Sequence, residues 1–180
     1  TTTKSGFSDT AVYALYRKEI FEKAGYFDEE LVRHQDNDMH KRIRDLGGKF
    51  FMNVEMKADY FSRNSIKKLL RQMFLIGYYL PDLLSRNALS KKYLAPFAFY
   101  FLLFLNLIFY LIDFPFFGFL FLAQLGVYLL LIALETIFKS ISHRSLSAIL
   151  NIFLIPAIHI FYALGTAAGY FRLLLKSKKS

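Results

Sequence analysis

The chain has 180 residues, 55% of them hydrophobic and 18% aromatic, and a formal net charge of +9. This composition excludes a disordered chain and a collagen-like fibre, and the absence of cysteine excludes a disulfide scaffold and a zinc site built on thiolates. The charge is unevenly divided: residues 1–92 hold 17 Lys and Arg and 12 Asp and Glu, whereas residues 93–180 hold 6 and 2. The second half is therefore not a soluble globular domain, and the composition predicts two regions of different character.

The chain begins with Thr, and its first ten residues are hydrophilic, without the apolar run of a signal peptide. We expect either a processed product or, as the favoured reading, a piece of a longer protein. Such a piece can lack part of an active site.

In the polar half, the first predicted helix covers Tyr16–Ala24, with apolar positions at Ile20 and Phe21 and a glycine C-cap at Gly25. The aromatic and acidic stretch Tyr26–Leu31 has no clear period and is interpreted as a loop.

A second helix is predicted to start at a cap supplied by Asp36, Asn37 or Asp38. Its apolar positions are spaced at i, i+4 and i+7, and a glycine pair ends it; these residues are Met39, Ile43, Leu46, Gly47 and Gly48. The stretch Lys49–Tyr60 predicts one or two short strands. Residues 1–63 thus form an α/β fragment of about 60 residues, which is small for an independent core.

From Ser65 the pattern becomes a basic amphipathic helix, which Pro81 is expected to bend or stop. Because apolar tracts follow closely, we interpret residues 64–92 as an interfacial helix and linker at the membrane surface; a surface helix of a soluble domain is the alternative. Lys91 and Lys92 would mark the edge of the bilayer.

Residues 93–180 predict a helical membrane domain of two to three transmembrane helices, at about 93–112, 116–138 and 146–171. The polar turn Asp113–Pro115 separates the first two tracts. The third contains Pro156 and Gly165, so it either spans the membrane or re-enters it.

If two helices form a hairpin, Lys91, Lys92, Lys139 and Arg144 lie on one side, and the positive-inside rule places the polar half in the cytoplasm. A third helix that spans once would put the C-terminal cations, beginning with Arg172, on the other side. The sequence therefore predicts a multi-pass protein of the cell (inner or plasma) membrane.

Asp36 is the main candidate for chemistry, because it sits where the positive end of a helix dipole stabilises a negative charge. Such a carboxylate can cap the helix, bind a divalent cation with Asp38, or accept a proton from a hydroxyl. The flanking His34 and His40 lack the spacing of a zinc site. No glycine-rich phosphate loop occurs, and a membrane surface explains the basic surplus better than nucleic acid does.

Residues 9–29, 31–50 and 60–79 resemble, in this order, the C-terminal part of a membrane-attached family 2 glycosyltransferase with the GT-A fold, of the succinoglycan and exopolysaccharide type. The matching motifs are Gly25-Tyr26-Phe27-Asp28-Glu29, the pair Gln35-Asp36, and a later segment with Arg63, Ser65, Arg71 and Gln72. The tail from His159 through Gly165 and Gly169 to Arg172 resembles the closing pattern of that subgroup.

The resemblance implies inverting transfer of a sugar from a nucleotide-sugar to a lipid-linked or polysaccharide acceptor, with Asp36 as general base. It implies substrate-binding roles for Gln35, Asp38, Arg63, Arg71 and Gln72. Mg²⁺ or Mn²⁺ would be bound mainly by an N-terminal half that is not in this chain, so no metal ligand is assigned here and the chain alone is expected to be inactive. Membrane lipids are the other expected partner.

Two departures from the family pattern change the expectation. Gln35 stands where the family usually has Glu, and the tryptophan-containing signature of processive synthases is absent, which favours addition of a single sugar. The rival interpretation is a non-catalytic membrane module or transporter component, in which Asn106, Gln124, Asn151 and His159 would line a pathway. We prefer the view that these polar residues satisfy one another between helices.

Overall fold

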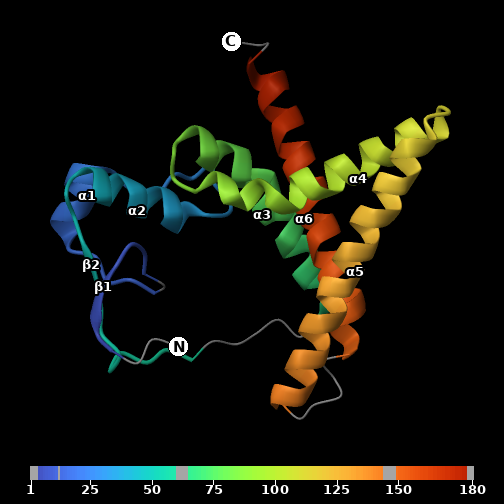
Figure 1. Ribbon diagram of the computed structural model, residues 1–180. Helices are drawn as coiled ribbons and strands as arrows, with labels where there is room; N and C mark the ends of the chain where they lie inside the picture. The colour runs from blue at the N-terminus through green and yellow to red at the C-terminus, as the bar shows by residue number, and fades with distance from the viewer. Residues whose placement is uncertain (1–3, 12, 60–64, 144–148, 178–180) are drawn as a thin grey trace.

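The computed structural model describes residues 4–11, 13–59, 65–143 and 149–177. Figure 1 shows a small unit of short elements, from which longer helices extend. In chain order the elements are β1 (Gly6–Ser8), α1 (Lys18–Ala24), α2 (Gln35–Asp45), β2 (Phe50–Met52), α3 (Ile66–Ser85), the 3-10 turn η1 (Lys91–Leu94), α4 (Ala95–Leu111), α5 (Pro115–His143) and α6 (Asn151–Ser177). The described chain is therefore mostly helical.

The polar region, residues 4–59, has a core made by α1, α2 and β2. Met39, Ile43 and Phe50 are buried there, and Ile20 and Phe21 of α1 pack against them. Helix α1 ends at Gly25, whose φ of 77° lies in the left-handed region that glycine adopts without strain, as predicted.

The α/β character of this region is limited to one two-stranded sheet. Strand β2 confirms the strand expected after Lys49, and it pairs antiparallel with β1, with Phe7 opposite Phe51. The sequence predicts no strand in the hydrophilic segment that contains β1. Three residues with one apolar side chain are too few to show an alternating pattern.

Two details of α2 differ from the prediction. The N-cap is His34, with φ 65°, and no side chain caps the helix, so the expected cap by Asp36, Asn37 or Asp38 is not formed. Leu46, expected on the buried face, follows the last helical residue and is 55% exposed. Gly47 follows with φ 80°, and the N–H of Gly48 bonds the carbonyl of Ile43 at 2.9 Å, so the predicted glycine pair ends the helix before Leu46 can turn inward.

Helix α3 does not stop at Pro81 but continues to Ser85. Pro81 is buried where α3 crosses α6, and this crossing is the most extensive contact between two helices in the described chain. A Cβ at Gly77 would overlap the carbonyl oxygen of Tyr162, and one at Gly165 would overlap that of Phe74. Glycines therefore let the two backbones touch, as in small-residue contacts between membrane helices.

Three helices are long and apolar enough to cross a membrane: Lys91–Leu111, Pro115–Ser142 and Asn151–Lys176. The turn at Asp113, with φ 73°, lies between the first two as predicted. The second span extends beyond the expected residue 138. The third continues through Pro156 as one helix without the reversal that re-entry requires.

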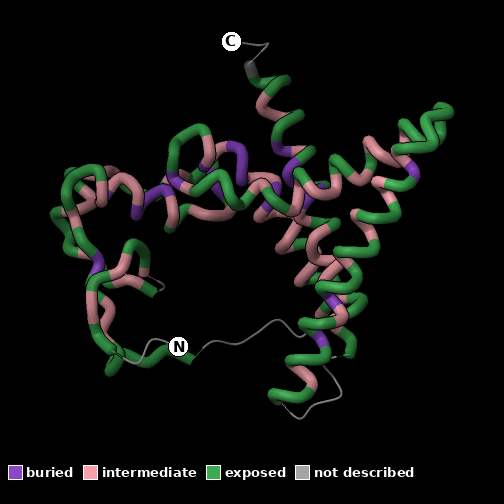
Figure 2. Tube along the Cα trace, viewed as in Figure 1, coloured by how far each residue is buried: buried purple, intermediate pink, exposed green. Residues whose placement is uncertain are grey.

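Much of the apolar surface of these three helices faces outward, away from the rest of the protein. Figure 2 shows few buried residues along α4 and α5, and large side chains such as Phe119, Phe138 and Phe153 are more than half exposed. A surface of this kind is stable in hydrocarbon and not in water. The exposure therefore agrees with a multi-pass membrane protein.

The carboxyl end of α6 lies beside the polar region. Arg172 pairs with Asp82 of α3, and Lys176 lies 3.3 Å from Glu30. Figure 1 shows that the end of α5 lies by the beginning of α6, away from the carboxyl end of α6. This separation agrees with the expectation for a third helix that spans once, in which the C-terminal cations lie on the other side from Lys139. The orientation in the membrane stays a prediction.

Candidate active site

The first turn of α2 places the residues of highest interest at the surface. Gln35 and Asp36 are exposed, whereas Asp38, Met39 and His40 in the next turn are buried. A carboxylate oxygen of Asp36 accepts the N–H of Asn37 at 2.9 Å. Asp36 is therefore free of the ion pairs that engage Asp38, and it can receive a proton from outside.

His34 fixes this turn to α3. Its Nε2 lies 3.3 Å from the carbonyl oxygen of Ile76, and its Nδ1 lies 3.2 Å from the amide nitrogen of Asn37. These contacts require a neutral ring with its proton on Nε2. Burial, the largest effect, lowers the pKa of His34 and favours the same neutral form. Because α3 packs on α6, the contact sets Asp36 close to the membrane helices.

His40 holds the other side of the turn. It is fully buried, with Nδ1 2.7 Å from the hydroxyl of Thr10 and Nε2 2.7 Å from that of Tyr16. Burial lowers the pKa of His40 and raises that of Tyr16, and the negative charge of Asp36 raises the pKa of Tyr16 further. Asp36 thus lies near this hydrogen-bonded set. The sequence offered no signal that would bring Thr10, Tyr16 and His40 together.

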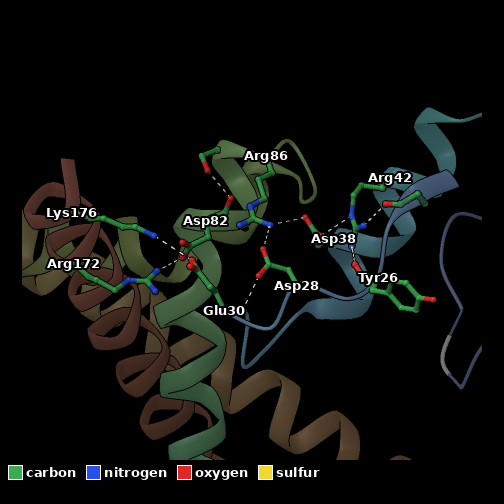
Figure 3. Close-up of polar contacts among 11 residues, drawn as sticks. Tyr26, Asp28, Glu30, Asp38, Arg42, Asp82, Arg86, Arg172 and Lys176 are labelled. Atoms are coloured by element: carbon green, nitrogen blue, oxygen red, sulfur yellow. Dashed lines mark hydrogen bonds and ion pairs between the residues drawn. The ribbon is translucent and has the colours of Figure 1, made fainter. Parts of the chain in front are cut away.

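Asp38 belongs to an ion-pair network that Figure 3 shows between α2 and the end of α3. Its carboxylate is 3.0 Å from Arg42 Nε and 3.2 Å from a terminal nitrogen of Arg86, which also lies 2.7 Å from Asp28. The hydrogen bond from Arg86 holds the pKa of Asp28 below its usual range, and the two carboxylates raise the pKa of Arg86. The network unites two motifs, around Asp28 and Asp38, that are ten residues apart in sequence.

An open pocket of about 410 Å³ lies over this network. Its lining carries as many carboxylates as cations: Asp28, Asp38, Lys41, Arg42, Asp45 and Arg86, together with Tyr26. Arg42 also donates to the carbonyls of Ala24 and Tyr26, so its donors are engaged by the protein. The pocket offers no unpaired charge that would select a ligand.

The other predicted substrate-binding residues lie on or near α3. Arg71 is exposed on this helix. Gln72 is four residues before Ile76, which puts it one turn from the His34 contact on the same side of the helix. Arg63 lies outside the described residues. The structure thus places Gln35 and Asp36 at the junction of α2 with α3, the helix that carries Arg71 and Gln72.

Arg33 is a candidate that sequence reasoning missed. It precedes His34, and its Nε is buried without a hydrogen-bond partner among the described residues. A buried guanidinium nitrogen that lacks an acceptor is costly, and a bound anion would remove that cost. In the sequence, Arg33 was one of many cations with nothing to distinguish it.

No group of three histidine or acidic side chains close enough to hold a metal ion occurs within residues 4–11, 13–59, 65–143 and 149–177. The described residues therefore do not fit a divalent cation site. Asp36 and Asp38 do not form one together, because Asp38 is committed to Arg42 and Arg86.

Asn106, Gln124 and His159 form hydrogen bonds within the helical region, as predicted, whereas the hydroxyls of Thr136 and Ser140 in α5 are buried without a hydrogen-bond partner among the described residues. Asn106 donates to Gln124 at 3.0 Å, and Gln124 donates to the carbonyl of Phe99 at 2.9 Å. His159 bonds the hydroxyl of Tyr128 at 2.9 Å. Groups that satisfy one another between helices stabilise the bundle, so these contacts give no support to a transport pathway.

A curated protein is similar to about half of this chain. It is the dolichyl N-acetyl-alpha-D-glucosaminyl phosphate 3-beta-D-2,3-diacetamido-2,3-dideoxy-beta-D-glucuronosyltransferase of Methanococcus voltae, 30% identical over 98 residues. The match covers 54% of this chain and 30% of that protein, so the chain spans under a third of its relative. No protein-family model and no solved structure matches the chain significantly.

Proposed function

We propose that the chain is part of a membrane-bound inverting glycosyltransferase that moves a sugar from a nucleotide-sugar to a lipid-linked acceptor. The observation that carries the proposal is the similarity to a glycosyltransferase whose named acceptor is a dolichyl phosphate-linked sugar. The exposed carboxylate of Asp36, docked by His34 against the helices, supports it. A reaction on a lipid-linked acceptor needs its catalytic group at the membrane surface.

Asp36 acts as the general base. It takes the proton of an acceptor hydroxyl while that oxygen forms a bond to the anomeric carbon, and the bond from that carbon to the nucleoside diphosphate breaks with inversion. The diphosphate leaves with the bonding electrons. Asp36 suits this role because it is exposed and has no ion-pair partner among the described residues.

Side chains around Asp36 would bind the substrates. Gln35 and Gln72 supply amide groups for sugar hydroxyls, and Arg71 and Arg33 supply cations for phosphate oxygens, which guanidinium groups bind in a forked geometry. Arg63, also expected to contact phosphate, keeps that role as a prediction from the sequence.

Asp38 is assigned a different task from the one first expected. Because its side chain is 6% exposed and engaged by Arg42 and Arg86, we assign it to positioning α2 rather than to direct contact with substrate. Asp38 thus supports the reaction indirectly, because its ion pairs with Arg42 and Arg86 would hold the helix that carries Asp36 in place.

The donor would be bound in the main by sequence outside this chain, together with Mg²⁺ or Mn²⁺, and no step is assigned to a metal here. The proposal extends to family 2, the GT-A fold, a role in cell-surface or extracellular polysaccharide synthesis, and a catalytic part on the cytoplasmic side. Its support for these finer points is the sequence resemblance.

The test uses the full-length protein in membranes, with a labelled nucleotide-sugar and extracted lipid acceptor. We expect Asp36→Asn to lower transfer about a thousandfold, in line with loss of a general base, without changing the amount of folded protein. Asp45→Asn is the matched control, since Asp45 lies on the same helix and forms a surface pair with Lys41. Normal transfer by Asp36→Asn would refute the assignment.

A further inference from the structure

A second open pocket lies at the start of the first span, away from the charged network. Its volume is about 440 Å³, and it is lined by Lys92, Tyr93 and Pro96 from η1 and α4 and by Ile158, His159 and Tyr162 from α6. None of these residues was assigned to the candidate active site. The surfaces are mostly apolar, with one cation, Lys92, and no carboxylate.

The residues that line the pocket are fixed by contacts with their neighbours. The hydroxyl of Tyr162 donates to the carbonyl of Tyr93 at 2.8 Å, which ties α6 to the start of α4. His159 is held through Nδ1 by Tyr128. The ammonium of Lys92 lies 5.6 Å from the centre of the Tyr93 ring, a cation–π distance that keeps the charge at the rim.

This arrangement suits an amphiphile with one anionic group. A lipid phosphate would meet Lys92, where the first span begins, and a hydrocarbon chain would lie against Pro96, Ile158 and the rings of Tyr93 and Tyr162. The volume is in the range of small-molecule pockets, so it holds the head of a lipid and the first part of its chain.

The pocket adjoins the candidate active site through a short series of contacts. Tyr162 lines the pocket, and its backbone carbonyl lies where Gly77 allows α3 to touch α6. The residue before Gly77 is Ile76, whose carbonyl contacts His34 at the start of α2. Figure 1 shows the beginning of α4 close to this crossing.

We propose that this pocket binds the phosphate and proximal isoprenoid units of the lipid-linked acceptor, with Lys92 as the phosphate ligand. The inference rests on the proposed function, which supplies the acceptor class. It commits to a phosphate-linked polyisoprenoid rather than a bulk phospholipid, because the pocket is connected to the site at which the acceptor sugar would react.

The chain offers a closely matched pair of variants. Lys91 and Lys92 are adjacent, exposed and equally charged, but only Lys92 lines the pocket. The experiment measures binding of a labelled polyprenyl phosphate to the full-length protein in nanodiscs of neutral lipid, with unlabelled phosphatidylglycerol as competitor. We expect Lys92→Gln to weaken binding at least about fivefold and Lys91→Gln less than about twofold, given the contribution of one Lys near a phosphate surface.

Equal effects of the two variants, or no effect of either, would overturn the proposal. Equal competition by phosphatidylglycerol would also overturn it, because the pocket would then be a general site for anionic lipids. Tyr162→Phe removes the hydrogen bond to Tyr93 and should weaken lipid binding. Tyr110→Phe is its control, because Tyr110 lies on α4 but does not line the pocket, and it should weaken binding less. Asp36→Asn should bind the lipid normally, so failure of the catalytic assignment and failure of the lipid site give different results.

Discussion

The polar region and the helical region differ in the kind of contact that each makes with α3. In the polar region a small core is joined to the end of α3 by charges, with Asp38 between Arg42 and Arg86. In the helical region α3 meets α6 through glycines that bring the backbones into contact. The contact between α3 and α6 is thus made between backbones, whereas the contact of the polar region with the end of α3 is made between charged side chains.

The proposed general base lies at the boundary between the two regions. Asp36 is the exposed carboxylate of the first turn of α2, and His34 links that turn to α3. The polar groups of the spans are paired among themselves at Asn106, Gln124 and His159. If Asp36 is the general base, as proposed, the reaction takes place where the polar region meets the helices.

The largest effect on stability is expected at the glycine crossing. Gly165→Ala places a methyl group against the carbonyl of Phe74, which should cost about 3 kcal/mol and lower the Tm by roughly 10 °C. Gly126→Ala in α5 is the control, since a Cβ there meets nothing within 4 Å and helix propensity improves. Thermal unfolding in detergent measures both. Equal Tm values would show that the α3–α6 contact does not support the fold.

A smaller effect is expected in the ion-pair network. Asp38→Ala leaves two arginines without their buried acceptor and should cost about 2 kcal/mol, less than a fully buried pair because Arg86 remains partly exposed. Asp45→Ala, which removes an exposed partner of Lys41, should cost less than about 0.5 kcal/mol. The same unfolding assay compares them. A cost for Asp38 no larger than that for Asp45 would contradict the positioning role.

The smallest expected effect is a dependence of folding stability on pH, caused by His34 at the boundary between the two regions. The pKa of His34 is lowered by burial, so as the pH falls below 6.5 the unfolded chain binds a proton before the folded one does, and stability decreases from there down to the folded pKa. His34→Gln should reduce the loss of Tm between about pH 7.5 and about pH 5. Burial also lowers the pKa of His40, so part of the dependence of Tm on pH should remain in the His34→Gln variant. A slope unchanged by the substitution would indicate that the ring is not buried against α3.

Local signals in the sequence predicted much of the fold. Gly25 ends α1, Asp113 separates two spans, and the charge-free stretches become membrane-length helices, because each feature depends on neighbouring residues. Pro81 was expected to bend or stop its helix, and the stop does not occur, because α3 continues to Ser85. A Cβ at Gly169 would lie 3.2 Å from the proline ring, so α6 packs closely against α3 at this point.

The site was less predictable, because its contacts join distant residues. The sequence indicated Asp36 as the general base and Asp38 as a substrate-binding residue, and only the fold shows that the first carboxylate is exposed and the second is buried beside Arg86. The spacing of Gly165 and Gly169 could have indicated the helix crossing. Nothing in the local sequence distinguishes Arg33.

The central claim is that Asp36 does chemistry while Asp38, two residues away, maintains position. The direct measurement is the rate of sugar transfer per folded molecule, together with the Tm, for Asp36→Asn and Asp38→Asn in the full-length protein. The account predicts that Asp36→Asn keeps its Tm and loses transfer, whereas Asp38→Asn loses Tm and retains measurable transfer at a temperature where it is folded. Transfer that survives in Asp36→Asn but disappears from folded Asp38→Asn would contradict it.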